Sequence, residues 1–307
     1  MRTIDSVDLP PGLLTRPLCH DDAQAVYELI AASEEADLGA ALIDLEDILG
    51  DWQRPSLDFE RDTLAVLDGE RLVALAELSA SGRVEASVHP TARGRGIGTY
   101  VVAWTEDRVR ARGGARVSQT VAATSVSAVD LLLGRGYQQL WTSWLLELPA
   151  DAEIRGDGTP PDGVVVRPYQ PGEEHLAFQV VEDAFNEWPE RPPSTFEDWA
   201  APVLKRPGFE PWHLLVAAHG DELVGVCNVV VSGNSVWVNQ LAVRRDQRGR
   251  GLGRVLLVAA FQEGRARGAG TAELSTDSRT GALGLYEHVG MSVTDTFLHL
   301  ALDLHGD

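Results

Sequence analysis

Short apolar runs and longer runs with helical periodicity alternate along the whole 307-residue chain. In the second part, apolar residues three and four positions apart predict helices over Glu173–Phe185 and Gly251–Arg267. Shorter apolar runs bounded by turn residues predict strands and one short helix between and after them. These elements are expected over His213–Ala218, Leu223–Val231, Ser235–Val243, Ala272–Ser275 and, for the helix, Ala282–Val289.

The first part of the chain repeats this order of elements. A helix is expected over Asp22–Ala32, and a second long helix ends near Arg112. The strands between them are expected over Thr63–Leu67, Leu72–Leu78 and Arg83–Val88. Interleaved strands and helices place each part in the mixed α/β class, with a central mixed β-sheet flanked by helices.

Two sequence landmarks occur twice at nearly the same offset. The segment Ser87–Gly98, SVHPTARGRGIG, matches Ala242–Gly253, AVRRDQRGRGLG, 155 residues later. The pair Gly136-Tyr137 matches Gly290-Met291, 154 residues later. Because two landmarks share the offset, the pattern predicts a duplicated domain.

The boundary between the copies follows from a change in composition. Residues 151–163, DAEIRGDGTPPDG, are rich in Gly, Pro and Asp, which predicts a linker. On its far side Val164–Tyr169 reads as an opening strand, as Leu13–Pro17 does near the start of the chain. We therefore expect an N-terminal domain over 1–150 and a C-terminal domain over 164–307.

The repeated Arg-Gly-Arg-Gly-x-Gly segment lies between a predicted strand and a predicted helix. Glycines let the backbone adopt positive φ and approach a ligand closely. The amides of such a loop, at the positive end of a helix, form a site for phosphate or pyrophosphate. A P-loop is excluded because neither copy has its Lys-Ser/Thr pair, and a dinucleotide fingerprint is excluded because Thr99 and Arg254 stand where its last glycine is required.

The loops resemble the pyrophosphate loop of the GNAT family of N-acetyltransferases, Arg/Gln-x-x-Gly-x-Gly/Ala. The chain carries Arg93-x-x-Gly96-x-Gly98 and Arg248-x-x-Gly251-x-Gly253. The segment Leu285–Met291, LYEHVGM, is similar to the family's Leu-Tyr-x-x-x-Gly-Phe. The resemblance covers nearly the whole chain, once per half, and implies two tandem GNAT-fold domains.

In this family the loop amides bind the pyrophosphate of an acyl-CoA, and the strand before the loop pairs with its pantetheine arm. The resemblance therefore implies acetyl-CoA, or another acyl-CoA, as the cofactor. The implied binding residues of the second half are Leu241, Ala242, Val243, Arg248, Gly249, Arg250, Gly251, Leu252, Gly253 and Arg254. Those of the first half are Val88, Arg93, Gly94, Arg95, Gly96, Ile97, Gly98 and Thr99.

The chemistry that the resemblance implies is direct attack of a primary amine on the thioester. Tyr286 aligns with the family's tyrosine near the CoA sulfur, and we expect it to protonate the departing thiolate. Packing of the helix against the sheet is the alternative role for this side chain. Aligning the two glycine pairs sets Leu132 opposite Tyr286, so we expect the second half to be catalytic. Whether the first half binds acyl-CoA or only supports the fold stays open.

A general base is harder to assign from the sequence. The strand before the second loop has no carboxylate near its centre, where Asn239 and Gln240 could orient a water. The first half has Glu85 opposite Gln240. Other candidate bases are Glu182, Asp183 and Glu187, for which a solvated helix face is the alternative.

The stretch Phe185–Pro193 is a candidate part of the acceptor pocket. Trp188, flanked by Glu187 and Glu190, would suit an amine-bearing sugar or a similar small cation through ring stacking and charge. A Pro-rich loop over the core is the alternative. Three functions are therefore open: a small-molecule N-acetyltransferase, a tandem acetyltransferase similar to mycothiol synthase, and a non-catalytic acyl-CoA-binding sensor.

Composition narrows the partners further. The net charge of −20 and the absence of a Lys/Arg-rich run argue against nucleic-acid binding and mildly favour cationic substrates. The two cysteines, Cys19 and Cys227, exclude a disulfide scaffold and fit a reducing cytoplasm. The N-terminal segment lacks the apolar core of a signal peptide, and no apolar run is long enough to span a membrane. We expect a cytoplasmic protein, monomeric because the two halves can pair within one chain.

Overall fold

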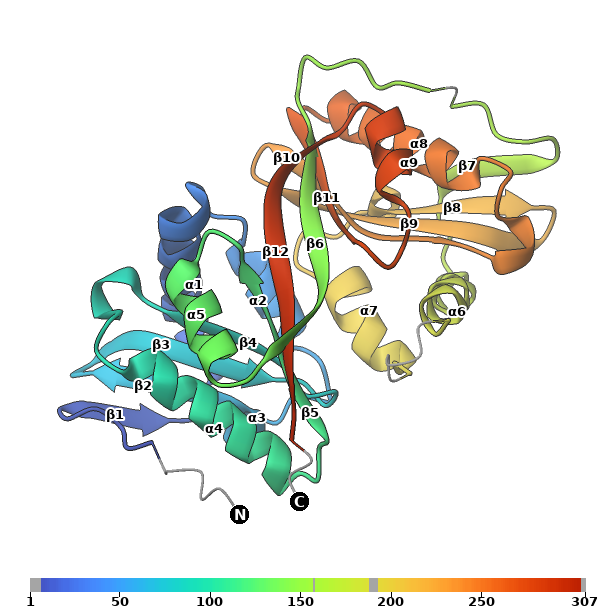
Figure 1. The fold of residues 1–307 in the computed structure, drawn as a ribbon. Coiled ribbons are helices and arrows are strands. Elements are labelled where there is room, and N and C mark those ends of the chain that lie inside the picture. Colours follow the sequence, from blue (N-terminus) through green and yellow to red (C-terminus); the bar gives the residue numbers. More distant parts are fainter. Residues whose placement is uncertain (1–6, 157, 188–192, 305–307) are drawn as a thin grey trace. The chain divides into compact units, whose positions relative to one another are not determined.

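The computed structural model describes residues 7–156, 158–187 and 193–304 (Figure 1). The chain divides into two compact units, each of which is described by itself below. The N-terminal unit comprises residues 1–142 and 296–307, and the C-terminal unit comprises residues 143–295.

The N-terminal unit is a mixed sheet with the strand order β1-β2-β3-β4-β5-β12. Its neighbouring strands are antiparallel except for β4 and β5, which run parallel. Its strands are β1 (Leu13–Arg16), β2 (Thr63–Asp68), β3 (Arg71–Leu78), β4 (Arg83–Val88), β5 (Arg116–Ala122) and the larger part of β12 (Ser292–Asp303). Its helices are η1 (His20–Asp22), α1 (Ala23–Leu38), α2 (Leu45–Asp51), α3 (Phe59–Asp62), η2 (Pro90–Ala92), α4 (Ile97–Ala111) and α5 (Val126–Gly134).

The C-terminal unit has the strand order β6-β11-β10-β9-β8-β7, with β10 and β11 parallel and its other neighbours antiparallel. Its strands are β6 (Gln138–Leu148, of which 143–148 belong here), β7 (Val164–Pro168), β8 (Leu214–His219), β9 (Glu222–Ser232), β10 (Ser235–Val243) and β11 (Thr271–Asp277). Its helices are α6 (Glu174–Phe185), α7 (Phe196–Leu204), η3 (Pro211–His213), η4 (Arg245–Gln247), α8 (Leu252–Ala266) and α9 (Leu283–His288).

The strand that closes each sheet comes from the other half of the sequence. In the N-terminal unit, β12 pairs with β5, with Leu300 opposite Gln119. In the C-terminal unit, β6 pairs with β11, with Leu146 opposite Leu274. The compact units therefore divide inside β6 and β12, whereas the sequence repeat divides at the linker 151–163. Both strands end in apolar stretches with similar burial, so each can complete the edge of an equivalent sheet.

Helices cover both faces of each sheet, which confirms the α/β class. In the N-terminal unit, α4 and α5 enclose one core with Val101 and Leu132, and α1 and α2 enclose a second core with Leu29 and Ile48. The C-terminal unit repeats this arrangement, with α8 and α9 on one core and α6 and α7 on the other. Phe261 of α8 is 1% exposed, and burial of a side chain of this size stabilises the fold by about 1.5–3 kcal/mol.

The parallel strand pair of each unit separates part-way along its length. The pairing of β4 with β5 extends only through Val84 and Gln119, and the pairing of β10 with β11 only through Val238 and Leu274. Beyond these residues the strands diverge and leave a wedge next to the glycine loop. In the C-terminal unit β10 also has a register shift at Asn239, and β4 pairs with β3 without one. The widening of each sheet thus places a wedge beside each repeated loop.

Candidate active site

The glycine loops have the backbone geometry that their sequence predicts. Gly94 and Gly96 have φ of 76° and 84°, and Gly249 and Gly251 have φ of 76° and 82°. These are left-handed values that other residues adopt only at a cost. Gly96 and Gly251 are also the N-caps of α4 and α8. The amides of the first helical turn, which lack an i−4 partner, therefore point out of the positive end of the helix toward an anion site.

The third glycine of each loop has a different role. It lies inside the helix, with a negative φ that any residue can adopt. A Cβ on Gly98 would lie 3.3 Å from Leu131 Cδ2, and a Cβ on Gly253 would lie 3.6 Å from Leu285 Cδ2. The small residue lets α4 and α8 approach the helix that carries the position of Tyr286. Leu131 and Leu285 are 154 residues apart, so the repeat extends to this packing contact.

The loop of the C-terminal unit lines a cavity of about 620 Å³ that fills the wedge between β10 and β11. All the residues implied by the resemblance for this half line the cavity, except Arg250, whose side chain bonds to Gln247. Tyr286 of α9 lines it as well. Phe185, from the stretch expected at the acceptor pocket, lines it too, as do Leu285, Thr276, Asp277 and Thr280. Further lining residues that the sequence did not single out are Ser143, Ala184, Val238, Leu274, Ser275 and Ala282.

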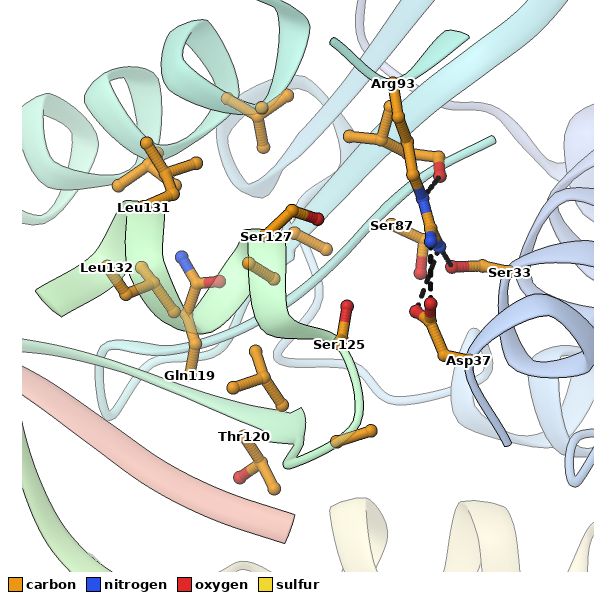
Figure 2. A pocket seen from close by; sticks show the side chains of 18 of the residues that line it. Ser33, Asp37, Ser87, Arg93, Gln119, Thr120, Ser125, Ser127, Leu131 and Leu132 are labelled. Atoms are coloured by element: carbon orange, nitrogen blue, oxygen red, sulfur yellow. Dashed lines mark hydrogen bonds and ion pairs between the residues drawn. The ribbon is translucent and has the colours of Figure 1, made fainter. Parts of the chain in front are cut away.

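The N-terminal unit has an equivalent cavity of about 520 Å³ (Figure 2). Val88, Arg93, Gly94, Gly96, Gly98 and Thr99 line it, as the resemblance implies. Ile97 is buried in the core instead, and Arg95 pairs with Asp68 at 2.7 Å. Leu132 of α5 stands where α9 carries Tyr286, and it is 1% exposed.

Tyr286 is held in its cavity as a protonated phenol. The residue is only 8% exposed. Burial raises the pKa of its hydroxyl above 10, and a hydrogen bond with the Thr276 side chain partly opposes this increase. The hydroxyl is therefore available as a donor at neutral pH. Cys227, which is also near this site, is fully buried, and burial raises the pKa of its thiol to about 12, so it is not a candidate nucleophile.

The first arginine of each loop braces the loop against the helical layer. Arg248 donates from Nη1 to Glu187 over 2.8 Å, and Arg93 donates from Nη1 to Asp37 over 2.6 Å. In both cases Nε donates to the carbonyl of the last residue of the preceding strand, at 3.0 and 3.2 Å. These guanidinium groups are thus occupied within the protein, which leaves the backbone amides as the main groups that could bind an anion.

Comparison with known proteins also finds two copies of one domain in the chain. The sequence profile of the acetyltransferase (GNAT) family matches residues 23–137 and, a second time, residues 175–291. The chain belongs to the GNAT acetyltransferase family. Curated relatives named mycothiol acetyltransferase match it over nearly their whole length. The protein from Thermobispora bispora is 30% identical over 287 residues, covering 88% of this chain and 92% of the relative. The protein from Nocardia farcinica is 30% identical over 307 residues, covering 91% and 93%.

Solved structures of GNAT proteins also match this chain over nearly its whole length. A GCN5-related N-acetyltransferase from Sphaerobacter thermophilus superimposes with a TM-score of 0.76 at 31% identity, covering 97% of this chain and 98% of that one. A tandem GNAT protein from the clavulanic acid biosynthesis pathway superimposes with a TM-score of 0.74 at 19% identity, covering 96% and 99%, and supports the fold. The tandem GNAT fold predicted from the sequence is confirmed. GNAT membership makes the chain an acetyltransferase, and acetyl-CoA is the acyl donor of such enzymes, as expected from the loops.

The two polar residues of the GNAT central strand that could orient a water are held by protein partners. Asn239, at the bulge of β10, donates from Nδ2 to Asn228 Oδ1 over 3.1 Å. Gln240 accepts a hydrogen bond from Trp199 Nε1 over 2.9 Å. These contacts fix the strand where it leaves β11.

The carboxylates expected as general bases lie in three different settings. Glu182 is 7% exposed and accepts from the backbone N–H of Ser194 over 2.7 Å, which ties the chain to α6. Asp183 accepts from Gln179 on the exposed face of α6. Glu187 alone of the three lines the cavity, but its hydrogen bonds with Arg248 lower its pKa and make it a weaker base. Trp188 and Glu190, expected at the acceptor pocket, lie outside the described residues.

A further carboxylate in the GNAT cavity was not among the general bases expected from the sequence. Asp277 ends β11 at the mouth of the wedge, and its side chain is 12% exposed. It is held at 2.6 Å by Arg279, two residues further along the chain. Its position could have been noticed in the sequence, because a charged residue at the end of a buried strand lies at the carboxyl edge of a parallel strand pair, where functional groups often lie.

The N-terminal unit has its own group of acids next to β4. Glu85, expected opposite Gln240, is exposed and pairs with Arg83 at 3.0 Å. Its cross-strand partner Glu77 is largely buried, and Arg54 donates to it over 2.6 Å. Burial, followed by the charge of Asp51, raises the pKa of Glu77 to about 7. The unit that has Leu132 at the position of Tyr286 therefore contains a buried carboxyl group with a strongly raised pKa.

None of the helices in the described ranges is long and apolar enough to cross a membrane.

Proposed function

We propose that the C-terminal unit transfers the acetyl group of acetyl-CoA to a primary amine of a small molecule. The observation that carries this proposal is the convergence of three features in one cavity. The anion-binding loop, the diverging strand pair and the buried hydroxyl of Tyr286 all line it. In the other cavity the first two features are present, but Leu132 replaces the tyrosine.

The reaction follows from this geometry. The amides after Gly249 bind the pyrophosphate, and the free edge of β10 over Leu241–Val243 pairs with the pantetheine arm, which brings the thioester to the narrow end of the wedge. The neutral amine nitrogen attacks the thioester carbon, so that a C–N bond forms and the C–S bond breaks. Holding both reactants in one cavity supplies much of the rate enhancement.

Protons balance through one acid on the protein. The attacking nitrogen loses a proton to solvent, and Tyr286 gives its hydroxyl proton to the departing sulfur. A free phenol, with a pKa near 10, is a weak donor to a thiolate with a pKa near 8.5. Because burial penalises the phenolate as well as the thiolate, the transfer requires a group that stabilises the phenolate, and the hydrogen bond with the Thr276 side chain, which lowers the pKa of Tyr286, supplies this stabilisation.

For the acceptor, we propose an amine related to mycothiol. The support is the name shared by curated relatives that are about 30% identical over most of their length. The acidic balance of the chain agrees with an acceptor that is cationic in solution.

We also propose that the cavity of the N-terminal unit binds acyl-CoA without turnover. It keeps the loop geometry and the wedge, and lacks the tyrosine. The acyl-CoA sensor hypothesis thus applies to this unit. A single polypeptide would then have one catalytic site and one binding site for the same cofactor. The monomeric state and the cytoplasmic location expected from the sequence stay predictions.

Calorimetry with acetyl-CoA tests the assignment of the two cavities. Thr99 and Arg254 are the third residues of α4 and α8, where a glutamate is favourable and its carboxylate can fold back over the helix N-terminus. Arg254→Glu and Thr99→Glu therefore place an anion at one pyrophosphate site each. We expect two sites in the wild type, the loss of one in each variant, and the loss of turnover only in Arg254→Glu. Turnover that survives in Arg254→Glu and is lost in Thr99→Glu would reverse the assignment.

A further inference from the structure

The two cavities differ by an exchange of residue type at two neighbouring positions. In the C-terminal unit, β11 contributes Leu274 and α9 contributes Tyr286. In the N-terminal unit, β5 contributes Gln119 at the position of Leu274, and α5 contributes Leu132 at the position of Tyr286. The polar group at the narrow end of the wedge thus comes from the helix in one unit and from the strand in the other.

Gln119 is placed at the point where the strands separate. It is opposite Val84 in the last pair of the β4–β5 ladder, and the cavity begins beyond it. Figure 2 shows its side chain extending from β5 beside Leu132 toward α5. The glutamine is only 6% exposed.

The amide nitrogen of Gln119 is buried and has no hydrogen-bond partner among residues 7–156, 158–187 and 193–304. A buried donor without a partner costs more than the bond itself contributes, so native proteins rarely retain one without a reason. A leucine fills the same position in the equivalent unit, so packing does not require a polar side chain here. Together with the cavity, the unpartnered donor indicates a ligand that carries an acceptor.

The direction in which acyl-CoA would lie identifies this acceptor. The pyrophosphate site is at the end of β4 that follows Val88, and Gln119 lies beside Val84, about 13 Å back along the strand. The pantetheine arm extends from the pyrophosphate along this strand, and its far end carries the thioester. The carbonyl oxygen of the thioester is the acceptor that reaches the narrow end of the wedge.

We propose that Gln119 Nε2 donates a hydrogen bond to the thioester carbonyl of acyl-CoA and makes the N-terminal cavity selective for acyl-CoA over free CoA. This inference rests on the proposed binding of acyl-CoA by that unit. Unlike the phenol of Tyr286, an amide N–H is too weak an acid to protonate a departing thiolate. Gln119 therefore holds the thioester intact, and the site reports whether CoA is acylated.

The test uses the full chain with Arg254→Glu, so that only the N-terminal cavity binds. Calorimetry compares acetyl-CoA with free CoA and with S-ethyl-CoA, a thioether that has similar bulk and no carbonyl. We expect acetyl-CoA to bind about 3- to 10-fold more tightly than either, the difference that one neutral hydrogen bond provides. Adding Gln119→Leu should reduce the difference to less than about twofold and leave the affinity for CoA unchanged.

A matched control and a second measurement complete the test. Gln24→Leu makes the same change on the exposed face of α1, where the Gln24 side chain donates to Glu28 over 2.9 Å, and should preserve the preference. The infrared band of ¹³C-labelled thioester carbonyl should move to lower frequency on binding and return toward its free position in Gln119→Leu. Equal affinity for acetyl-CoA and CoA, or a preference that survives Gln119→Leu, would overturn the role of Gln119. Failure of all three ligands to bind would instead overturn acyl-CoA binding by this unit, and the inference with it.

Discussion

Arg248 and Glu187 are joined by two hydrogen bonds, of 2.8 and 3.0 Å, that connect the second glycine loop to the segment after α6. The loop is thereby positioned by a residue that stands 61 positions earlier in the sequence. Because the hydrogen bonds from Arg248 lower the pKa of Glu187, the carboxylate stays ionised and paired at neutral pH. The pair positions the loop without using its backbone amides.

Glu187→Gln should weaken this brace without removing a reacting group. We expect the KM for acetyl-CoA to increase about 3- to 10-fold with kcat nearly unchanged, since a lost positioning contact acts on binding. Steady-state kinetics of CoA release measure both constants. Asp183→Asn, on the exposed face of α6, is the control and should change neither. A fall in kcat of about 100-fold or more with unchanged KM would instead identify Glu187 as the general base.

Tyr286→Phe removes the hydroxyl and keeps the ring in the core. We expect kcat to fall by about 10²–10⁴-fold, the usual contribution of one general acid, while the affinity for acetyl-CoA stays within about threefold. Tyr169→Phe in the same unit is the control, because its ring packs near Phe209 and does not line the cavity. Turnover that is unaffected by Tyr286→Phe would leave the ring with a packing role only.

The two glycines of the C-terminal loop should respond differently to alanine. Gly251 has a φ of 82°, so Gly251→Ala should lower the free energy of unfolding by about 1–2 kcal/mol and weaken acetyl-CoA binding. Gly253 has no such backbone requirement, and its added Cβ would make ordinary contact with Leu285 at 3.6 Å. Gly253→Ala should therefore be close to wild type in stability. Urea unfolding and calorimetry distinguish the two, and equal loss in both variants would contradict the geometry.

The buried carboxyl of Glu77 should make stability depend on pH. Its pKa is raised from 4.5 to about 7, so between these values the folded state binds more protons than the unfolded state. Its contribution to stability is thus present at low pH and is lost as pH rises toward 7. Glu77→Gln should remove this slope from the free energy of unfolding, measured in urea at pH 5 and pH 8. Glu85→Gln, at an exposed position, should keep it, and an unchanged slope in Glu77→Gln would argue against a raised pKa.

Local chemistry explains what could be predicted from the sequence. The glycines of the loops were placed correctly at strand-to-helix junctions because their positive φ and helix-capping positions depend on neighbouring residues alone. The repeat offset located the equivalent positions of Tyr286 and Leu132. Whether these residues bind and act as proposed is decided by the experiments above.

Contacts between distant residues explain what could not be predicted. The sequence does not show that Arg93 pairs with Asp37, or that Glu182 binds the backbone of Ser194, because neither contact has a local spacing rule. For the same reason Gln119 was not singled out, since its significance lies in a missing partner and in the leucine at the equivalent strand position. The pattern of apolar and polar side chains is similar in β6 and β12. It therefore does not show which of the two sheets each of these strands joins.

The crossing of β6 and β12 between the halves has a consequence for biosynthesis. The sheet that begins with β1 acquires its last strand, β12, only from residues near the end of the chain. When residues 1–150 have been synthesised, the first sheet therefore still lacks β12. At that stage β6 also lacks its partner strand β11. The first sheet therefore acquires its last strand only after β7 to β11 of the second sheet have been synthesised, so the two halves of the sequence do not fold in turn as independent units.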